Sequence, residues 1–352
     1  MRRLAGVLVA GAFLVGLSGV ASADDGVQLS FGAAASYVQD LNDPTAAPGL
    51  NAATYSSMEQ DESFNIDLIQ IGITGTRGAA SGHIKIDFGD LTTLSGDSTT
   101  GDVGLQEAYL SYDFGGAVGT VGRFATPIGY EVLEPWGNAQ ISRSWAWQGQ
   151  PINHDGVTVS GGSDNIEAMI GAVNSFTVND TVANDVDDEK GIIGSIGVAL
   201  DDALNVYGAG LFSEFNDTIE RQYYNLILSG NLDEVLASGL SYAIEGHYRQ
   251  DDPKGPGSTD MWGITVYGGA EFGPTGIDLR WEYMDDEGLV LGANTELWSL
   301  TVTASWALAD GREVRGEYRH DDADDPIFVD ESTVDDTLDT LQAQVVWYPT
   351  SQ

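Results

Sequence analysis

The sequence contains no cysteine and has few basic residues. Without cysteine there is no disulfide framework, no thiol nucleophile and no thiolate metal site. The 352 residues include 14 Lys and Arg against 54 Asp and Glu. Two of the arginines lie among the first 23 residues, so the remainder carries 12 basic and 54 acidic residues, a formal charge of −42. This balance argues against nucleic-acid binding and favours attraction of cations or a saline habitat.

Long apolar runs are missing after residue 23. A membrane-spanning helix needs about 20 consecutive apolar residues, and no such run follows that point. The segment Leu4–Val20 is apolar, follows Arg2 and Arg3, and precedes the small-residue site Ala21-Ser22-Ala23. These features predict an export signal peptide over residues 1–23, cleaved after Ala23. The alternative is an N-terminal anchor helix, and the shortness of the apolar run argues against it.

Helical periodicity is almost absent, and alternation of apolar and polar residues replaces it. Between residues 298 and 308, an apolar series that begins with Trp298 and Leu300 alternates with Ser and Thr. Residues 262–270, 277–283 and 341–347 alternate in the same way. This period of two predicts β-strands with one apolar and one polar face.

Three features favour a transmembrane barrel over a soluble sandwich. Charges occur deep within the polar faces, as at Arg280 and Glu317. The segments span about 10 to 14 residues, whereas soluble strands are usually about 5 to 6. Trp298 and Trp306 are separated by about 19 Å along the membrane normal if the strand is tilted by roughly 45°, close to an apolar band of about 25 Å. We therefore predict that the apolar faces meet lipid and the polar faces line the lumen.

The connections between the segments alternate in length. Seven are short: 77–82, 114–117, 161–165, 201–203, 230–236, 273–276 and 309–311. Eight are mostly long and polar: 40–63, 90–103, 125–154, 177–189, 215–218, 251–259, 285–294 and 320–336. Together they join sixteen strands, an even number typical of bacterial outer-membrane barrels with short periplasmic turns and long extracellular loops. We predict an all-β, antiparallel up-and-down barrel over residues 24–352 as one domain; one misassigned hairpin would give fourteen or eighteen strands.

The third long loop, from Ala125 to His154, is richer in Trp, Leu and Ile than the others. Its tryptophans would be poorly placed in free solvent, so we expect the loop to fold into the barrel and narrow the pore. Packing over the barrel rim is the alternative. The expected constriction residues are Arg123, Glu131, Glu134, Arg143, Trp145 and Trp147.

Other charged residues should line the lumen by strand parity. They could form a mixed-charge path for polar solutes, or they could pair with one another and brace the wall. We favour the bracing role for any single arginine. The expected lining residues are Glu245, Arg249, Asp278, Arg280, Glu282, Glu313, Arg315, Glu317 and Arg319.

The stretch Val121-Gly-Arg-Phe-Ala-Thr-Pro-Ile-Gly-Tyr-Glu131 resembles the OmpL-like β-barrel porin family, as do Ser142-Arg143-Ser144, Pro151 and His154-Asp155-Gly156-Val157. The specific match covers about residues 118–160. The resemblance implies a bacterial outer-membrane porin of broad solute range, embedded in outer-membrane lipids and commonly a homotrimer. Such barrels usually end on an aromatic residue that the barrel-assembly machinery recognises. This chain departs from that pattern, because four residues follow Trp347-Tyr348.

The acidic loops are possible sites for Ca²⁺ or Mg²⁺, which prefer oxygen ligands. Residues 321–336 hold eight carboxylates and residues 180–189 hold five. Neither segment has the spacing of an EF-hand loop, so a solvated anionic rim is the simpler interpretation. We predict no resident cofactor.

The four histidines, His83, His154, His247 and His320, are scattered, and no nucleophile-elbow or zinc-protease motif is present. We therefore expect a passive channel for ions and small hydrophilic solutes, with cation preference, and not an enzyme. The alternative function is a structural or adhesive barrel whose pore is plugged.

Overall fold

The computed structural model describes residues 25–42, 62–94, 103–174, 176, 190–216, 219–232, 239–255, 257–331 and 333–348. The predicted signal peptide over residues 1–23 and the acidic segment 180–189 lie outside these residues. Within the described ranges, no helix is both long and apolar enough to cross a membrane.

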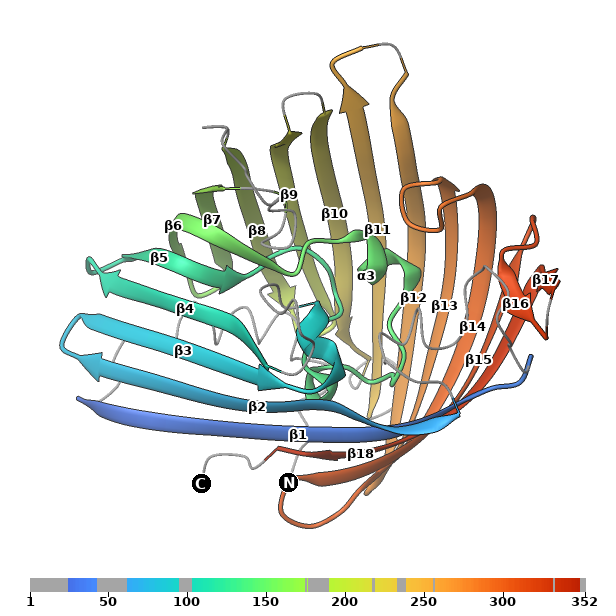
Figure 1. The fold of residues 1–352 in the computed structure, drawn as a ribbon. Helices are drawn as coiled ribbons and strands as arrows, with labels where there is room; N and C mark the ends of the chain where they lie inside the picture. Colours follow the sequence, from blue (N-terminus) through green and yellow to red (C-terminus); the bar gives the residue numbers. More distant parts are fainter. Residues whose placement is uncertain are drawn as a thin grey trace.

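Sixteen antiparallel strands close into a barrel in the order β1-β18-β15-β14-β13-β12-β11-β10-β9-β8-β7-β6-β5-β4-β3-β2, as Figure 1 shows. The fold class and strand number predicted from the sequence are confirmed. The barrel strands are β1 (Gly26–Asp40), β2 (Ser63–Arg77), β3 (Ala80–Phe88), β4 (Val103–Asp113), β5 (Ala117–Ala125), β6 (Asn153–Ser163), β7 (Ile166–Val173), β8 (Gly191–Asp201), β9 (Leu204–Asn216), β10 (Ile219–Asn231), β11 (Leu240–Pro253), β12 (Thr259–Phe272), β13 (Thr275–Glu287), β14 (Asn294–Ala307), β15 (Arg312–Ala323) and β18 (Thr337–Trp347).

The remaining elements lie in the long connections. They are the 3-10 helices η1 (Asp90–Thr93) and η2 (Pro135–Gly137), the short helix α3 (Trp145–Gly149), and the strands β16 (Phe328–Asp330) and β17 (Thr333–Asp335). The alternation in the sequence does not predict β16 and β17. These two short strands pair with each other as a small separate sheet. Strand β15 also extends to Ala323, so Asp321 and Asp322 belong to the barrel wall and not to the acidic loop.

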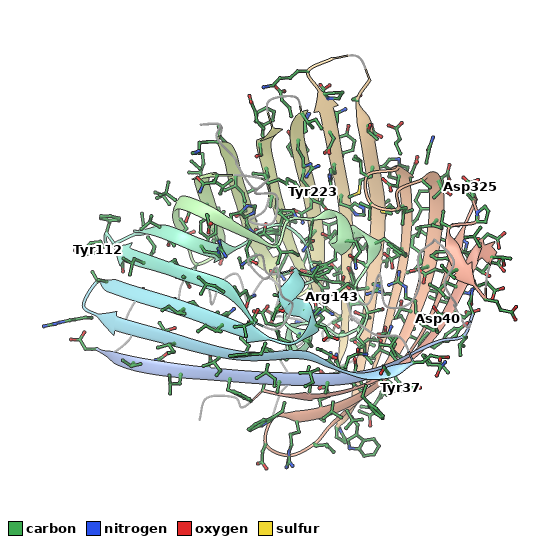
Figure 2. The ribbon with its side chains drawn as sticks, viewed as in Figure 1. Tyr37, Asp40, Tyr112, Arg143, Tyr223 and Asp325 are labelled. Carbon is green, nitrogen blue, oxygen red and sulfur yellow. The ribbon has the colours of Figure 1, made fainter. Side chains whose placement is uncertain are left out.

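The two faces of the barrel follow the alternation in the sequence. On β14, Leu300 and Trp306 remain 39% and 55% exposed on the outer face, whereas Thr301 and Thr303 between them are fully buried on the inner face. The outer face is therefore apolar and the inner face is hydroxylic and charged. Figure 2 shows the same arrangement, with Tyr112 projecting outside the barrel and Arg143 lying within it.

Candidate functional site

The connection between β5 and β6 lies inside the barrel. It contains η2 and α3, and none of its residues from 126 to 152 is exposed. In the ring of sixteen strands, β13 stands opposite β5 and β14 stands opposite β6. Because this inner loop (residues 126–152) begins at β5 and makes its ion pair with Arg280 on β13, it crosses the lumen from wall to wall.

Two glycines make room for the inner loop. Gly32 on β1 lies directly beneath the ring of Trp136, and a Cβ at this position would overlap that ring. Gly129 has a φ of 97°, and a Cβ there would overlap the side-chain amide of Gln150. The first glycine forms a socket in the wall for the loop, and the second lets the two ends of the loop approach each other.

Carboxylates on the far wall (β11, β13, β14 and β15) hold the inner loop by its backbone N–H groups. Glu317 accepts from Ile141 at 2.6 Å and from Ser142 at 2.9 Å, Glu282 accepts from Trp145 at 2.6 Å, and Glu245 accepts from Tyr130 at 3.2 Å. The loop has little regular structure of its own, so these buried N–H groups need partners from elsewhere. The far wall supplies them.

Arginines on the far wall hold the carbonyl groups of the same loop. Arg280 donates to Ser142 O at 2.8 Å, Arg319 to Arg143 O at 2.6 Å, Arg315 to Pro135 O at 2.9 Å and Arg249 to Gly149 O at 3.4 Å. Arg280 also forms a 2.7 Å ion pair with Glu131 of the loop. Alternating Arg and Glu residues on the wall thus match the alternating acceptors and donors of a peptide backbone.

The structure places all nine expected lining residues on the inner face of the wall. Seven contact the inner loop directly, as described above for Glu245, Arg249, Arg280, Glu282, Arg315, Glu317 and Arg319. Glu313 pairs with Arg315 at 2.6 Å, and Asp278 is half-buried between Ile277 and Leu279. Arg249, Arg280, Arg315 and Arg319 therefore hold the inner loop, and the wall-bracing role that the sequence favours for them stays a prediction.

Four of the six expected constriction residues are buried inside the loop packing. Arg143 donates to the carbonyl oxygens of Val132, Leu133 and Ile141 and stacks on Trp147. Trp147 packs in an apolar cluster with Leu68, Leu91 and Leu133. Trp145 donates from its indole to Asp321 at 2.8 Å, with Arg319 over its ring. Glu131 is also buried, between Arg280 and the N–H of Ser144.

Arg123 lies on the opposite face from the one expected, so its assignment to the constriction is wrong. It shares the parity of Val121, which is 53% exposed on the outer face, and its strand partner Asp155 shares the parity of Val157, which is 50% exposed. Arg123 and Asp155 form a bidentate pair at 2.8 and 3.0 Å on that outer face, at the end of β5 and β6 next to the loop.

Glu134 meets a second charged group, on the near wall (β3 and β4). Lys85 on β3 contacts Glu107 on β4 at 2.6 Å and Glu134 of the loop at 2.8 Å. Gln70 and Gln106 also donate to Glu134, at 3.2 and 3.0 Å. Burial alone would raise the pKa of Glu134, but the Lys85 ammonium and the hydrogen bonds from Lys85 and Gln106 lower that pKa to about 2.

The alternation in the sequence indicates the inward position of Lys85 but not that of Glu107. Lys85 stands between Ile84 and Ile86, so alternation alone places it on the polar face. On β4 the register with β3 shifts next to Lys85, and this bulge turns both Gln106 and Glu107 inward. A bulge changes the parity of every residue that follows it, so a strict period of two misplaces residues beyond that point.

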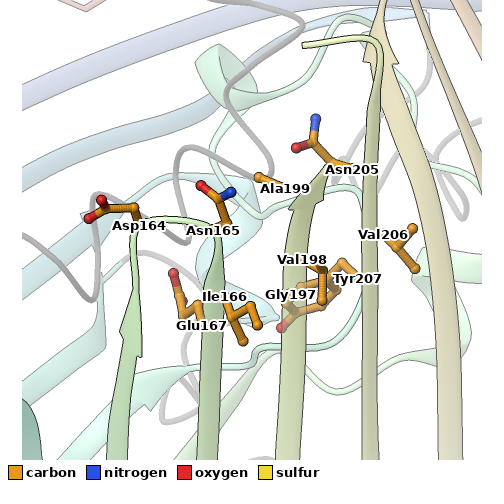
Figure 3. Close-up of a pocket in the computed structure, with 10 residues that line it drawn as sticks. All are labelled: Asp164, Asn165, Ile166, Glu167, Gly197, Val198, Ala199, Asn205, Val206 and Tyr207. Atoms are coloured by element: carbon orange, nitrogen blue, oxygen red, sulfur yellow. The ribbon is translucent and has the colours of Figure 1, made fainter. Parts of the chain in front are cut away.

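A small pocket lies away from this loop, at the turn ends of β7, β8 and β9 (Figure 3). It is predominantly apolar and includes Ile166, Val198 and Val206. Among the described residues, no group of three or more His, Asp or Glu side chains is arranged to hold a metal ion.

An apolar outer face, a charged inner face and a loop folded into a closed sixteen-stranded barrel define the class of outer-membrane porin-like proteins. Residues 27–347 match the family model described as Putative beta-barrel porin-2, OmpL-like. The chain belongs to this family, which confirms the resemblance seen in residues 121–157 and implies the bacterial outer membrane as its location.

Several solved structures share the fold. The anion-selective porin from Comamonas acidovorans aligns with a TM-score of 0.64 and 10% identity over 92% of this chain and 100% of that one. OmpT of Vibrio cholerae aligns with a TM-score of 0.61 and 12% identity over 93% and 99%. The channel DcaP of Acinetobacter baumannii aligns with a TM-score of 0.59 and 10% identity over 92% and 96%. No curated protein sequence matches the chain.

Proposed function

We propose that the protein is an outer-membrane porin that lets ions and small hydrophilic solutes diffuse passively, with the 125–154 loop as its constriction. The observation that carries this proposal is the path of the inner loop, which crosses the lumen and is fixed to both walls by its backbone and by Glu131 and Glu134. A fixed loop across a barrel narrows the water path to a constant width, as a size-selective pore requires.

We further propose that the channel prefers cations. The sequence after residue 23 carries a formal charge of −42, and two carboxylates, Glu107 and Glu134, share the single ammonium of Lys85 inside the lumen. An excess of negative charge raises the local concentration of cations and lowers that of anions. The anion-selective porin with the same fold supplies no counterargument, because selectivity depends on the particular side chains and not on the barrel.

Planar-bilayer recordings test both parts of the proposal. Purified, folded protein should produce discrete conductance steps, and protein unfolded by heat before addition should produce none. In a salt gradient the reversal potential should have the sign of cation preference. Anion preference would contradict the selectivity proposal, and folded protein without conductance would contradict the channel proposal.

A plugged structural barrel is the second candidate, and one observation favours it. No residue of the inner loop from 126 to 152 is exposed, and the far-wall side chains of Arg280 and Arg319 are fully buried beneath it. If this candidate is correct, deletion of the loop should create conductance that the intact protein lacks. A porin should conduct before the deletion and conduct more after it.

The cellular context is proposed from the sequence. The chain should be exported with its signal peptide removed after Ala23, inserted by the barrel-assembly machinery, and assembled as a homotrimer. Mass spectrometry of the mature N-terminus and gel migration of the unheated protein test the first and last of these statements.

A further inference from the structure

The near wall differs from the far wall in what its charges contact. Every far-wall arginine named above donates to a carbonyl of the inner loop, and the side chains of Arg280, Arg315 and Arg319 are 0%, 4% and 0% exposed. The charges of these three cannot touch a solute while the loop is in place, whereas the fourth, Arg249, is 10% exposed. The side chain of Lys85 is 22% exposed, that of Glu134 is 14% exposed and that of Glu107 is 9% exposed.

The near-wall triad (Lys85, Glu107 and Glu134) is a built site and not a chance contact. It joins β3, β4 and the inner loop, and Gln70 and Gln106 hold Glu134 in addition to Lys85. Gln106 and Glu107 both point inward because of the bulge in β4. The triad therefore presents one ammonium and two carboxylates, a formal charge of −1, at the point where the loop meets the wall. Asp87 lies beside it, shares the Gln70 amide with Glu134 and is fully buried.

We propose that the near-wall triad is the charged site that a passing solute meets, and that Glu134 and Lys85 set the ion selectivity with opposite signs. The ligands that it favours are small hydrated cations and organic ammonium ions, drawn by the second carboxylate that Lys85 leaves uncompensated. This inference rests on the proposed channel function. It assigns selectivity to β3, β4 and the loop, and gives the buried far-wall residues Arg280, Arg315 and Arg319 a positioning role only.

Charge-removing variants distinguish this role from simple anchoring of the loop. Glu134→Gln leaves Lys85 with Glu107 and a net charge of zero. One unit charge about 5 Å from an ion in water changes the local concentrations of cations and anions by about two- to fourfold in opposite directions, so the cation-to-anion permeability ratio should fall by about four- to sixteenfold. Lys85→Gln leaves two carboxylates, so the ratio should rise by a similar factor. If the triad only anchors the loop, both variants should loosen it and shift the ratio in the same direction.

The absence of cysteine from the sequence allows a direct test of accessibility. Lys85→Cys and Glu134→Cys should each react with a small cationic methanethiosulfonate added to open channels, and the conductance should fall in discrete steps. Arg123→Cys, on the outer face, is the matched control and should show no step. Channels that conduct normally but show no step at residues 85 and 134 would overturn the inference. Wild-type protein that does not conduct would instead overturn the proposed function.

Discussion

The two charged walls of this barrel contain similar residues that have different roles. On the far wall, Arg and Glu alternate, and their side chains end on the backbone of the inner loop. On the near wall, Lys85 and Glu107 meet a side chain of the loop, Glu134, and part of the group remains in contact with water. A charged residue on a lumenal face is thus not necessarily a residue that solutes encounter. The burial of the side chain and the group that it contacts decide whether a solute can reach it.

The largest expected effect comes from breaking the far wall at Arg280. This side chain donates to Glu131, Ser142 and Arg143, and Arg280→Ala leaves the Glu131 carboxylate buried without its partner. Removal of one member of a buried pair costs about 3–5 kcal/mol. The loop should detach, so single-channel conductance should rise and proteases should cut within residues 126–152.

Arg312→Ala is the control for this variant, because Arg312 is 51% exposed at a turn and pairs with Asp310. Its conductance and protease pattern should match the wild type. If Arg280→Ala also matched the wild type, the far wall would not hold the loop, and the contrast between the two walls would fail.

A smaller effect is expected when the socket for the loop is filled. Gly32→Val places side-chain atoms where the Trp136 ring lies, and overpacking of this kind typically costs about 1–3 kcal/mol. The midpoint of urea unfolding should fall, and the conductance should change as Trp136 moves. Gly75→Val on the neighbouring strand β2 is the matched control, since a Cβ there meets nothing within 4 Å. Equal effects of the two substitutions would rule out the socket.

Acid should neutralise Glu134 on the near wall only at low pH. The pKa of Glu134 is lowered from its usual 4.5 to about 2. A carboxyl group with a depressed pKa contributes stability above its unfolded-state pKa and loses it as the pH falls toward the folded-state value. The contribution of Glu134 to loop anchoring should therefore be constant from pH 7 to about 4.5 and decline between about 4.5 and 2, whereas its contribution to selectivity follows its charge in the folded protein and should fall only near pH 2. Reversal potentials of wild type and Glu134→Gln, measured across this range, should converge only at the acid end.

The barrel could be predicted from the sequence because its signal repeats. Each strand has the same period of two, and short turns alternate with long connections, so an error in one segment is corrected by its neighbours. Six of the seven short turns lie where the alternation predicts them, and β11 begins at Leu240, later than the predicted end of the 230–236 turn, without changing the strand number. Strand parity also placed residues such as Arg280 and Glu317 on the inner face.

The site is harder to predict because it depends on individual contacts and on one bulge, which do not repeat along the sequence. The backbone contacts of the inner loop have no sequence pattern, since any residue supplies an N–H and a carbonyl. Glu107 faces inward only because of a bulge, and the pairing of β16 with β17 involves just three residues on each strand. Arg123 lies next to the loop in the sequence, but its parity with Val121 and not this proximity determines the face on which it lies.

The smallest expected effect is at Arg123, and it tests the distinction between the inner and outer faces. Arg123→Gln removes a pair with Asp155 on the outer face, where the two side chains are 14% and 37% exposed and a surface ion pair contributes about 0–1 kcal/mol. The unfolding free energy should change by less than about 1 kcal/mol, and the reversal potential should stay at the wild-type value. Asp155→Asn removes the partner and should behave in the same way. A selectivity shift in Arg123→Gln as large as that in Glu134→Gln would mean that strand parity does not separate the solute path from the lipid face, so exposure could no longer be used to tell which charges a solute meets.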